Sequence, residues 1–260
     1  MSYKFAGTAG SHALRSAVSA APFPGAWPLS FAGWAQFNDL SLTSADSQPF
    51  SLEIDGNANQ NRIQLSSDVS DVDFDFVLKV GASTFTISID YGIMNILRDD
   101  WVFLAFVIRA DADRQGYCVH RGTLYSSVVD TNSLTYPAFD RVTFGYLPFF
   151  GGVIDHQGRI GASGLWSRKL TEPEILRMGR GEPLENFRNG MVDMWRLDGR
   201  VVSTTIKSMY HKLPLTVTGP PAWSIQQEPR ITKRFVFKPV AASGDTSGIV
   251  PNEVIFAFSG

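Results

Sequence analysis

Hydrophobic residues recur along most of the chain in short segments bounded by turn-forming residues. The clearest alternation covers residues 84–90, where Phe85, Ile87 and Ile89 share one side and hydroxyl side chains the other, as in a half-buried β-strand. Residues 101–108 (WVFLAFVI) are almost continuously apolar and predict a central strand covered on both faces. Similar patterns predict strands within residues 29–37, 50–55, 62–65, 117–120, 124–129, 141–145, 158–166 and 191–197.

A single segment has the signature of a helix. Thr171 is placed to act as the N-cap and Glu174 as its capping-box partner, with Pro173 in the first turn. Apolar residues follow, and Gly179 or Gly181 can end the helix. The sequence therefore predicts one short helix, of three turns at most, in a chain made otherwise of strands.

The composition fits many short strands joined by turns. The 260 residues include 23 Gly, 14 Pro and 19 Phe, a combination typical of β-rich domains. Hydrophobic residues make up 44% of the chain, which is enough apolar material for one large β domain, alone or with a small appendage. We therefore expect an all-β protein.

The charge balance and the single cysteine narrow the possible partners. A formal net charge of −2, from 23 basic and 25 acidic residues, gives no basic groove for nucleic acid. Cys118 has no second cysteine with which to form an intrachain disulfide. The first residues lack the apolar core of a signal peptide, and no apolar run approaches the roughly 20 residues that span a bilayer. We expect a protein made in the cytoplasm, not secreted by a signal peptide, and bound to neither nucleic acid nor membrane.

The composition changes near residue 224, which divides the chain into a domain of residues 1–224 and an arm of residues 225–260. Within the arm, residues 230–240 (RITKRFVFKPV) and 254–258 (VIFAF) have the character of strands, joined by a linker rich in small residues. An apolar strand beyond a closed sandwich must pair with another sheet edge. It pairs either with a neighbouring subunit or with its own domain. The candidate assembly residues are Arg230, Phe235, Phe237, Ile255, Phe256 and Phe258.

The order of these features resembles a known family. It is similar to phage-encoded proteins with a concanavalin A-like or laminin-G-like (LamG) domain, over roughly residues 3–223. The blocks that carry the resemblance are residues 3–7 (YKFAG), 31–34 (FAGW), 101–109 (WVFLAFVIR), 165–175 (LWSRKLTEPEI), 181–184 (GEPL), 195–197 (WRL) and 215–221 (LTVTGPP). The family's hairpin after the central strand is only approximated, by residues 117–122 (YCVHRG).

The resemblance implies a fold and a function. The fold is a two-sheet antiparallel jelly-roll sandwich, here with one short helix and a C-terminal β arm. The implied function is that of a bacteriophage virion structural protein, either a capsid decoration or minor capsid protein or a tail accessory. Its partners would be further copies of itself, in a homo-oligomer, and other virion proteins such as the major capsid protein. One alternative is a carbohydrate-binding module for a host surface glycan, and a less favoured one is a glycan hydrolase.

The hydrolase alternative depends on Glu53 and Asp55. Glycoside hydrolases with this fold present a Glu-x-Asp-x-(x)-Glu strand, in which two carboxylates act as nucleophile and general acid. Here Asn57 and Ala58 occupy the positions of the second glutamate. Without that carboxylate the acid–base pair is incomplete, and the sequence identifies no catalytic residue.

Two further groups are candidate ligand sites. Asp71, Asp73 and Asp75 alternate with apolar residues, so on a strand they would form a row of carboxylates suited to calcium. The simpler interpretation is an acidic strip that aids solubility or binds a neighbour's basic arm, with no cofactor. Trp27 and Trp223 lie beside prolines near predicted loops and are the candidate platforms for stacking a glycan.

Overall fold

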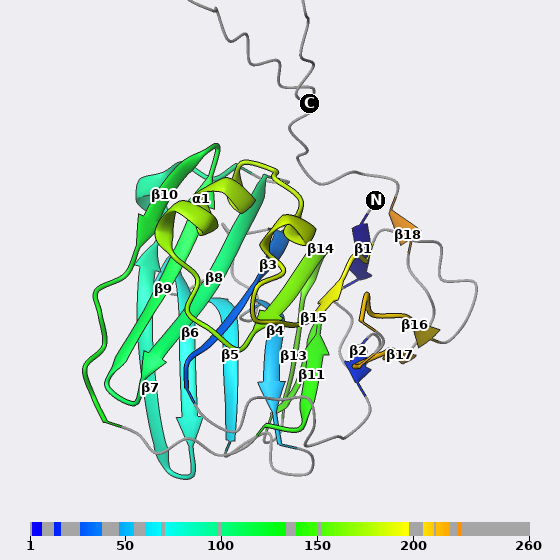
Figure 1. The fold of residues 1–260 in the computed structure, drawn as a ribbon, viewed down its shortest axis with the longest axis horizontal. Helices are drawn as coiled ribbons and strands as arrows, with labels where there is room; N and C mark the ends of the chain where they lie inside the picture. Colours follow the sequence, from blue (N-terminus) through cyan, green and yellow to red (C-terminus); the bar gives the residue numbers. More distant parts are fainter. Residues whose placement is uncertain are drawn as a thin grey trace, which may run out of the picture.

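Two antiparallel β-sheets packed face to face form this protein (Figure 1). The structure is a computed structural model. It describes residues 2–6, 13–16, 27–37, 47–54, 61–68, 71–97, 100–133, 139–149, 152–197, 205–210, 212–218 and 223–224. The architecture confirms the predicted all-β, two-sheet jelly-roll sandwich with one short helix. None of the helices in these ranges is long and apolar enough to cross a bilayer.

The first sheet, sheet A, is built around the apolar segment 101–108. Its strand order is β10 (Thr123–Ser126), β9 (Asp113–His120), β8 (Trp101–Ala110), β3 (Leu29–Phe37), β14 (Gln157–Trp166), β1 (Ser2–Ala6) and β18 (Trp223–Ser224), and β15 (Met191–Trp195) also pairs with β14. Residues 102–108 of β8 are all buried. The prediction of a central strand covered on both faces is therefore confirmed.

The second sheet, sheet B, forms the other layer. Its order is β16 (Thr205–Ile206), β17 (Leu215–Thr218), β2 (Ala13–Ser16), β11 (Arg141–Phe144), β4 (Ser47–Glu53), β5 (Asn61–Asp68), β6 (Asp73–Val80) and β7 (Ser83–Asp90). A hairpin of β12 (Tyr146–Phe149) and β13 (Gly152–Asp155) connects sheet B to sheet A. A 3-10 turn, η1 (Gly92–Met94), follows β7. Because β7 comes last in this strand order, it forms one edge of sheet B as described.

Aromatic side chains fill the space between the sheets. Phe31 of sheet A lies 5.7 Å from Phe50 and 6.2 Å from Phe144 of sheet B, ring centroid to centroid, and both pairs are edge-to-face. Trp195 meets Phe144 at 5.3 Å in the same manner. Such pairs add about 0.5–1.5 kcal/mol each to the free energy of burial. The alternation of apolar residues along each strand supplies this core, as the sequence predicts.

The helix α1 (Glu172–Gly179) covers the outer face of sheet A and forms a second apolar layer there (Figure 1). Ile175 and Met178 are fully buried against this face. Gly179 lies so close to β9 that a Cβ built on it would come within 2.3 Å of the Cβ of Val119. The helix begins in the predicted capping box and ends at the predicted glycine, after two turns.

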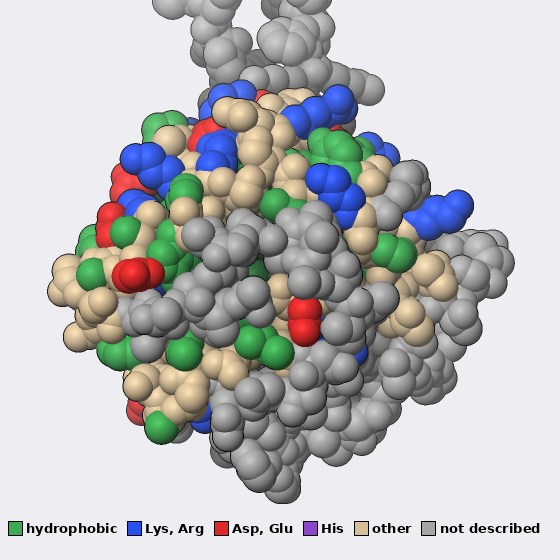
Figure 2. Space-filling model, turned by 60° about the horizontal axis from the view of Figure 1, so that its bottom comes forward, with side chains coloured by type: hydrophobic (Ala, Val, Ile, Leu, Met, Phe, Trp, Pro, Cys, Tyr) green, Lys and Arg blue, Asp and Glu red, His purple; other side chains and the backbone are tan. Residues whose placement is uncertain are grey.

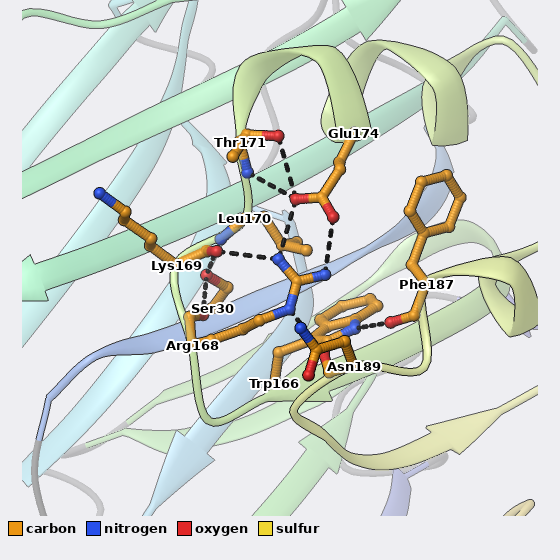
Figure 3. A network of polar contacts seen from close by, with 9 residues as sticks. All are labelled: Ser30, Trp166, Arg168, Lys169, Leu170, Thr171, Glu174, Phe187 and Asn189. Carbon is orange, nitrogen blue, oxygen red and sulfur yellow. Dashed lines mark hydrogen bonds and ion pairs between the residues drawn. The ribbon is translucent and has the colours of Figure 1, made fainter.

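A polar network fixes the start of this helix on the sheet (Figure 3). Thr171 N–H donates to Glu174 Oε2 at 2.9 Å, and Arg168 donates to both carboxylate oxygens of Glu174 at 2.8 Å. The Arg168 hydrogen bond is the main reason why the pKa of Glu174 lies below its usual value. Ser30 ties the network to β3, because its hydroxyl donates to the Arg168 carbonyl and accepts from Leu170 N–H. Helix and sheet are therefore held by charge-assisted bonds as well as by apolar contact.

The first and the last described strands of the chain, β1 and β18, are neighbours in sheet A. Ser2 and Tyr3 of β1 pair with Ser224 and Trp223 of β18. Residues 225–260, the predicted arm, lie outside the described residues, so the domain boundary near residue 224 stays a prediction.

Candidate binding face

The outer face of sheet B is polar, and we call it the polar face. Strand geometry sends alternate side chains to opposite sides, and Phe50, Leu52, Ile63 and Leu65 belong to the core between the sheets. Their neighbours therefore point outward. The side chains of the polar face are Ser51 and Glu53 on β4, Arg62, Gln64 and Ser66 on β5, Asp73, Asp75 and Lys79 on β6, Thr84, Thr86, Ser88 and Asp90 on β7, and Arg141 and Thr143 on β11.

One row of this face is made of charged residues on four neighbouring strands. Glu53 lies opposite Arg141 on one side and opposite Arg62 on the other, and Arg62 lies opposite Lys79. Residues directly opposite in adjacent strands are close enough for side-chain contact. Glu53 is buried, and one of its carboxylate oxygens accepts a hydrogen bond of 2.7 Å from the Thr143 hydroxyl. The row thus places one carboxylate among three cations.

A ladder of hydrogen bonds continues along β5. Arg62 Nε donates to Gln64 Oε1 at 2.8 Å, and Gln64 Nε2 donates to Ser66 Oγ at 3.0 Å. Burial lowers the pKa of Arg62, and the nearby charge of Glu53 partly opposes this effect. The planar side chains of Arg62 and Gln64 are therefore held in fixed orientations.

The polar face changes from covered to open across the sheet. Arg62 and Gln64 are each only 6% exposed. On the next strand Asp75 and Lys79 are half-buried. On β7 the hydroxyl residues are exposed, and Ser88 donates to Asp75 Oδ1 at 2.7 Å. The face therefore has a covered, charged centre and a solvent-facing margin on β6 and β7.

The surroundings of Glu53 bear on the hydrolase alternative. A retaining or inverting glycosidase needs a second carboxyl group across the substrate from the first. The register instead places Arg62 and Arg141 on the two sides of Glu53. Asp55 lies outside the described residues. Within the described part of sheet B, Glu53 is thus a hydrogen-bonded member of a charged row and has no carboxylate partner in its row.

The three aspartates proposed for calcium do not all lie on one strand. Asp71 is in the turn before β6, where Val72 has a φ of 63°, and the strand begins at Asp73. The expected row of three therefore shortens to Asp73 and Asp75, because the chain turns at Val72. In the ranges that the structure describes, no cluster of three or more His, Cys, Asp or Glu side chains is arranged to hold a metal ion.

The two candidate tryptophans lie in different environments. Trp27 is half-buried, packs against the main core, and its indole N–H donates to Asp111. The side chain therefore lies partly covered beside the turn at Asp111, and its role as a platform for a glycan stays a prediction. Trp223 belongs to β18, and its backbone pairs with Tyr3. The assembly residues Arg230, Phe235, Phe237, Ile255, Phe256 and Phe258 lie outside the described residues.

The sequence analysis missed the charged row of the polar face. Part of its signal was available, because Arg62, Gln64 and Ser66 alternate with Ile63 and Leu65, and this pattern places the polar residues together on one side of a strand. The positions of Arg141 and Glu53 opposite each other depend on the pairing of strands about 90 residues apart. Such a register follows from the fold and leaves no local mark in the sequence.

Comparisons with known proteins identify the fold. No protein-family model matches the sequence, and no curated protein matches it. A candidate carbohydrate-binding protein from Bacteroides ovatus superposes with a TM-score of 0.56 at 12% identity, over 87% of this chain and 63% of that one. The present chain thus spans less than two thirds of the Bacteroides protein. At this identity the likeness shows a shared jelly-roll β-sandwich and nothing finer.

Two other solved structures overlap less closely. The native heptameric SAP-like pentraxin from Limulus polyphemus has a TM-score of 0.49 at 17% identity, covering 68% of this chain and 81% of the pentraxin. The CBM40 domain of the IT-sialidase from Ruminococcus gnavus has a TM-score of 0.48 at 13% identity, covering 67% of this chain and 97% of the domain.

Proposed function

We propose that this chain is a non-catalytic carbohydrate-binding module that contacts its saccharide with the polar face of sheet B. The observation that carries the proposal is the open margin of that face, where the exposed hydroxyl groups of β7 lie beside the half-buried Asp75 and Lys79 of β6. Sugar-binding sites use a small number of fixed polar groups to match the hydroxyl groups of the ligand. The carboxylate, ammonium and hydroxyl groups of this margin supply such donors and acceptors.

The open margin of the face is the point of entry. A saccharide first meets the exposed hydroxyl groups of Thr84, Thr86 and Ser88 and the half-buried Asp75 and Lys79. The covered ladder on β5 forms the inner limit of the site. Binding of this kind depends on hydrogen bonds made at the surface, so we expect the modest affinities of a single module, in the micromolar to millimolar range.

The same geometry supports a binding role without catalysis. The charged row gives Glu53 two arginine neighbours, and no carboxylate lies opposite it on either neighbouring strand. Binding without turnover agrees with this arrangement. The shared fold of the candidate carbohydrate-binding protein from Bacteroides ovatus supports the proposal.

The test is glycan binding by the full chain, measured first on a glycan panel and then by calorimetry with the best ligand. The double variant Asp75→Asn/Lys79→Ala changes only half-buried side chains on the open margin. We expect it to weaken binding at least tenfold, which corresponds to about 1.4 kcal/mol. Lys169→Ala is the matched control, because Lys169 is exposed on the side of sheet A.

Two results would contradict the proposal. One is the lack of saturable binding to any saccharide on a broad panel. The other is binding that the margin variant and the control variant change equally, since the saccharide would then lie elsewhere. Release of reducing sugar that is lost in Glu53→Gln would instead show a hydrolase.

The expectation of a bacteriophage virion structural protein stays a prediction. It rests on the resemblance of the sequence and on the strand patterns of residues 225–260, which lie outside the described residues. Co-purification with phage particles is the measurement that addresses it.

A further inference from the structure

Strand β7 is an edge strand without the usual protection. It pairs with β6 without interruption, from Ser83 opposite Val80 to Asp90 opposite Asp73. No described strand pairs with its other side. Proteins normally protect such edges with bulges, prolines or lysines, and residues 83–89 contain none of these. Among the described strands, the outer edge of β7 can therefore accept another strand.

The two sides of β7 differ in chemistry. Ile87 and Ile89 point into the core and are buried. Ser88 and Asp90 point outward and are exposed, and Asp73 lies directly behind Asp90 on β6. In Figure 2 acidic and basic side chains are mixed at the left of the face that is shown. A strand that fits this edge must be apolar on one side and basic on the other.

Residues 234–238 of the same chain have this pattern. In an extended strand Phe235 and Phe237 share one side, and Arg234 and Lys238 share the other. The two phenylalanines would extend the apolar layer of the core. Arg234 would lie beside Asp90 and Asp73, where opposite charges across strands are favourable, and Lys238 would lie beside the hydroxyl group of Thr86.

We infer that residues 234–238 of one copy of this chain add as an antiparallel strand to the outer edge of β7 in a second copy. The register that satisfies both sides places Arg234 opposite Asp90 and Lys238 opposite Thr86. It also places Phe235 beside Ile89 and Phe237 beside Ile87. This assembly surface adjoins the open margin of the proposed saccharide site, because strand addition extends the sheet in its plane and places the added strand next to Thr86 and Ser88 of β7.

The length of the chain favours a second copy over the same one. Strands β18 and β7 lie on opposite flanks of the sandwich (Figure 1). In sheet B six strand spacings separate β17 from β7, which corresponds to a width of about 29 Å. A path around the outside of the sandwich adds its thickness of about 10 Å. The ten residues from 224 to 234 span at most about 35 Å. The path within one copy is therefore longer than these ten residues can span, which leaves the β7 edge of a second copy.

Cysteine cross-linking between two full-length variants tests this register. Ser88→Cys and Val236→Cys are prepared separately, one with a mass tag, then mixed and oxidised gently. Opposed residues in an antiparallel pair have Cα atoms about 4.5–5.5 Å apart, which suits a disulfide. The native Cys118 is fully buried. We expect a cross-linked heterodimer, and at least tenfold less of it when Ser126→Cys, on the β10 edge of sheet A, replaces Ser88→Cys.

A charge exchange provides an independent measurement on the full chain. Asp90→Lys should weaken self-association at least tenfold in sedimentation equilibrium, because it faces Arg234 with a like charge. The double variant Asp90→Lys/Arg234→Asp should restore association to within about threefold of the native chain.

Three results would overturn the inference. The first is a native chain that stays monomeric at about 100 µM. The second is equal cross-linking of Val236→Cys to Ser88→Cys and to Ser126→Cys. The third is a Ser88–Val236 disulfide that forms only within one chain carrying both cysteines. Loss of association with glycan binding intact would separate this surface from the saccharide site.

Discussion

Acid should destabilise this protein through one buried histidine. His156 joins β13 to β14 and has no exposed surface. Its Nδ1 lies 2.8 Å from Ser47 Oγ and its Nε2 lies 3.3 Å from the carbonyl oxygen of Arg159. A neutral ring satisfies both contacts, with Nε2–H donating to the carbonyl and Nδ1 accepting from the hydroxyl. Phe37 packs edge-on against the ring at 5.2 Å.

Burial lowers the pKa of His156 to about 4 from an ordinary value of 6.5, and hydrogen bonds to the carbonyls of Arg159 and Gln36 only partly oppose this effect. The unfolded chain binds a proton below pH 6.5, whereas the folded chain binds it only near pH 4. The stability that the neutral ring provides is therefore complete above pH 6.5 and is lost as the pH falls toward 4. The loss is about 2 kcal/mol at pH 5 and about 3 kcal/mol at pH 4.

Urea unfolding from pH 7.5 to pH 4, followed by tryptophan fluorescence, measures this loss. The matched variant is His156→Gln, whose amide can donate and accept but does not titrate. Asp100, Asp130 and Glu174 also have lowered pKa values, but their titration is common to both proteins. The native chain should lose about 2–3 kcal/mol more than the variant. Parallel curves, within about 0.5 kcal/mol, would refute the reasoning.

Three further predictions follow from the packing. Gly179→Ala should lower the free energy of unfolding, measured in urea, by about 2–3 kcal/mol, because the added methyl group meets Val119. The double variant with Val119→Ala should recover part of that loss. Additive effects of the two substitutions would show that the two sites are not in contact. Arg168→Ala should cost about 1–3 kcal/mol, because it leaves Glu174 half-buried without its partner; a thermal midpoint equal to that of the native chain would contradict this. Truncation after Ser224 should keep the thermal midpoint within a few degrees, and unfolding of the truncated chain would place the domain boundary elsewhere.

Local rules predicted the strands and the helix well. The period-two pattern of residues 84–90 and the apolar run 101–108 correspond to β7 and β8. Thr171 and Glu174 predicted the start of α1, because a capping box is complete within four residues. The aspartate row failed at Asp71, because the pattern alone did not show that the chain turns at Val72.

The polar face was harder to predict than the fold. Alternation along β5 shows that Arg62 and Gln64 share a side, but it does not show what lies beside them. The neighbours Glu53 and Arg141 are set by the register of β4, β5 and β11. The environment of Trp27 was not predictable for a similar reason, since its partner Asp111 lies 84 residues away in the sequence. Contacts between distant strands decide these environments, and one sequence carries little record of them.

The pairing of β1 with β18 has a practical consequence. Ser2 lies opposite Ser224 in the register, so the chain enters and leaves the sandwich at neighbouring points on one flank. Domains with adjacent ends tolerate insertion into a loop of a host protein and circular permutation. The sandwich can therefore be inserted as one unit into a loop of another protein. Its β7 edge would then face away from the two points at which the chains are joined.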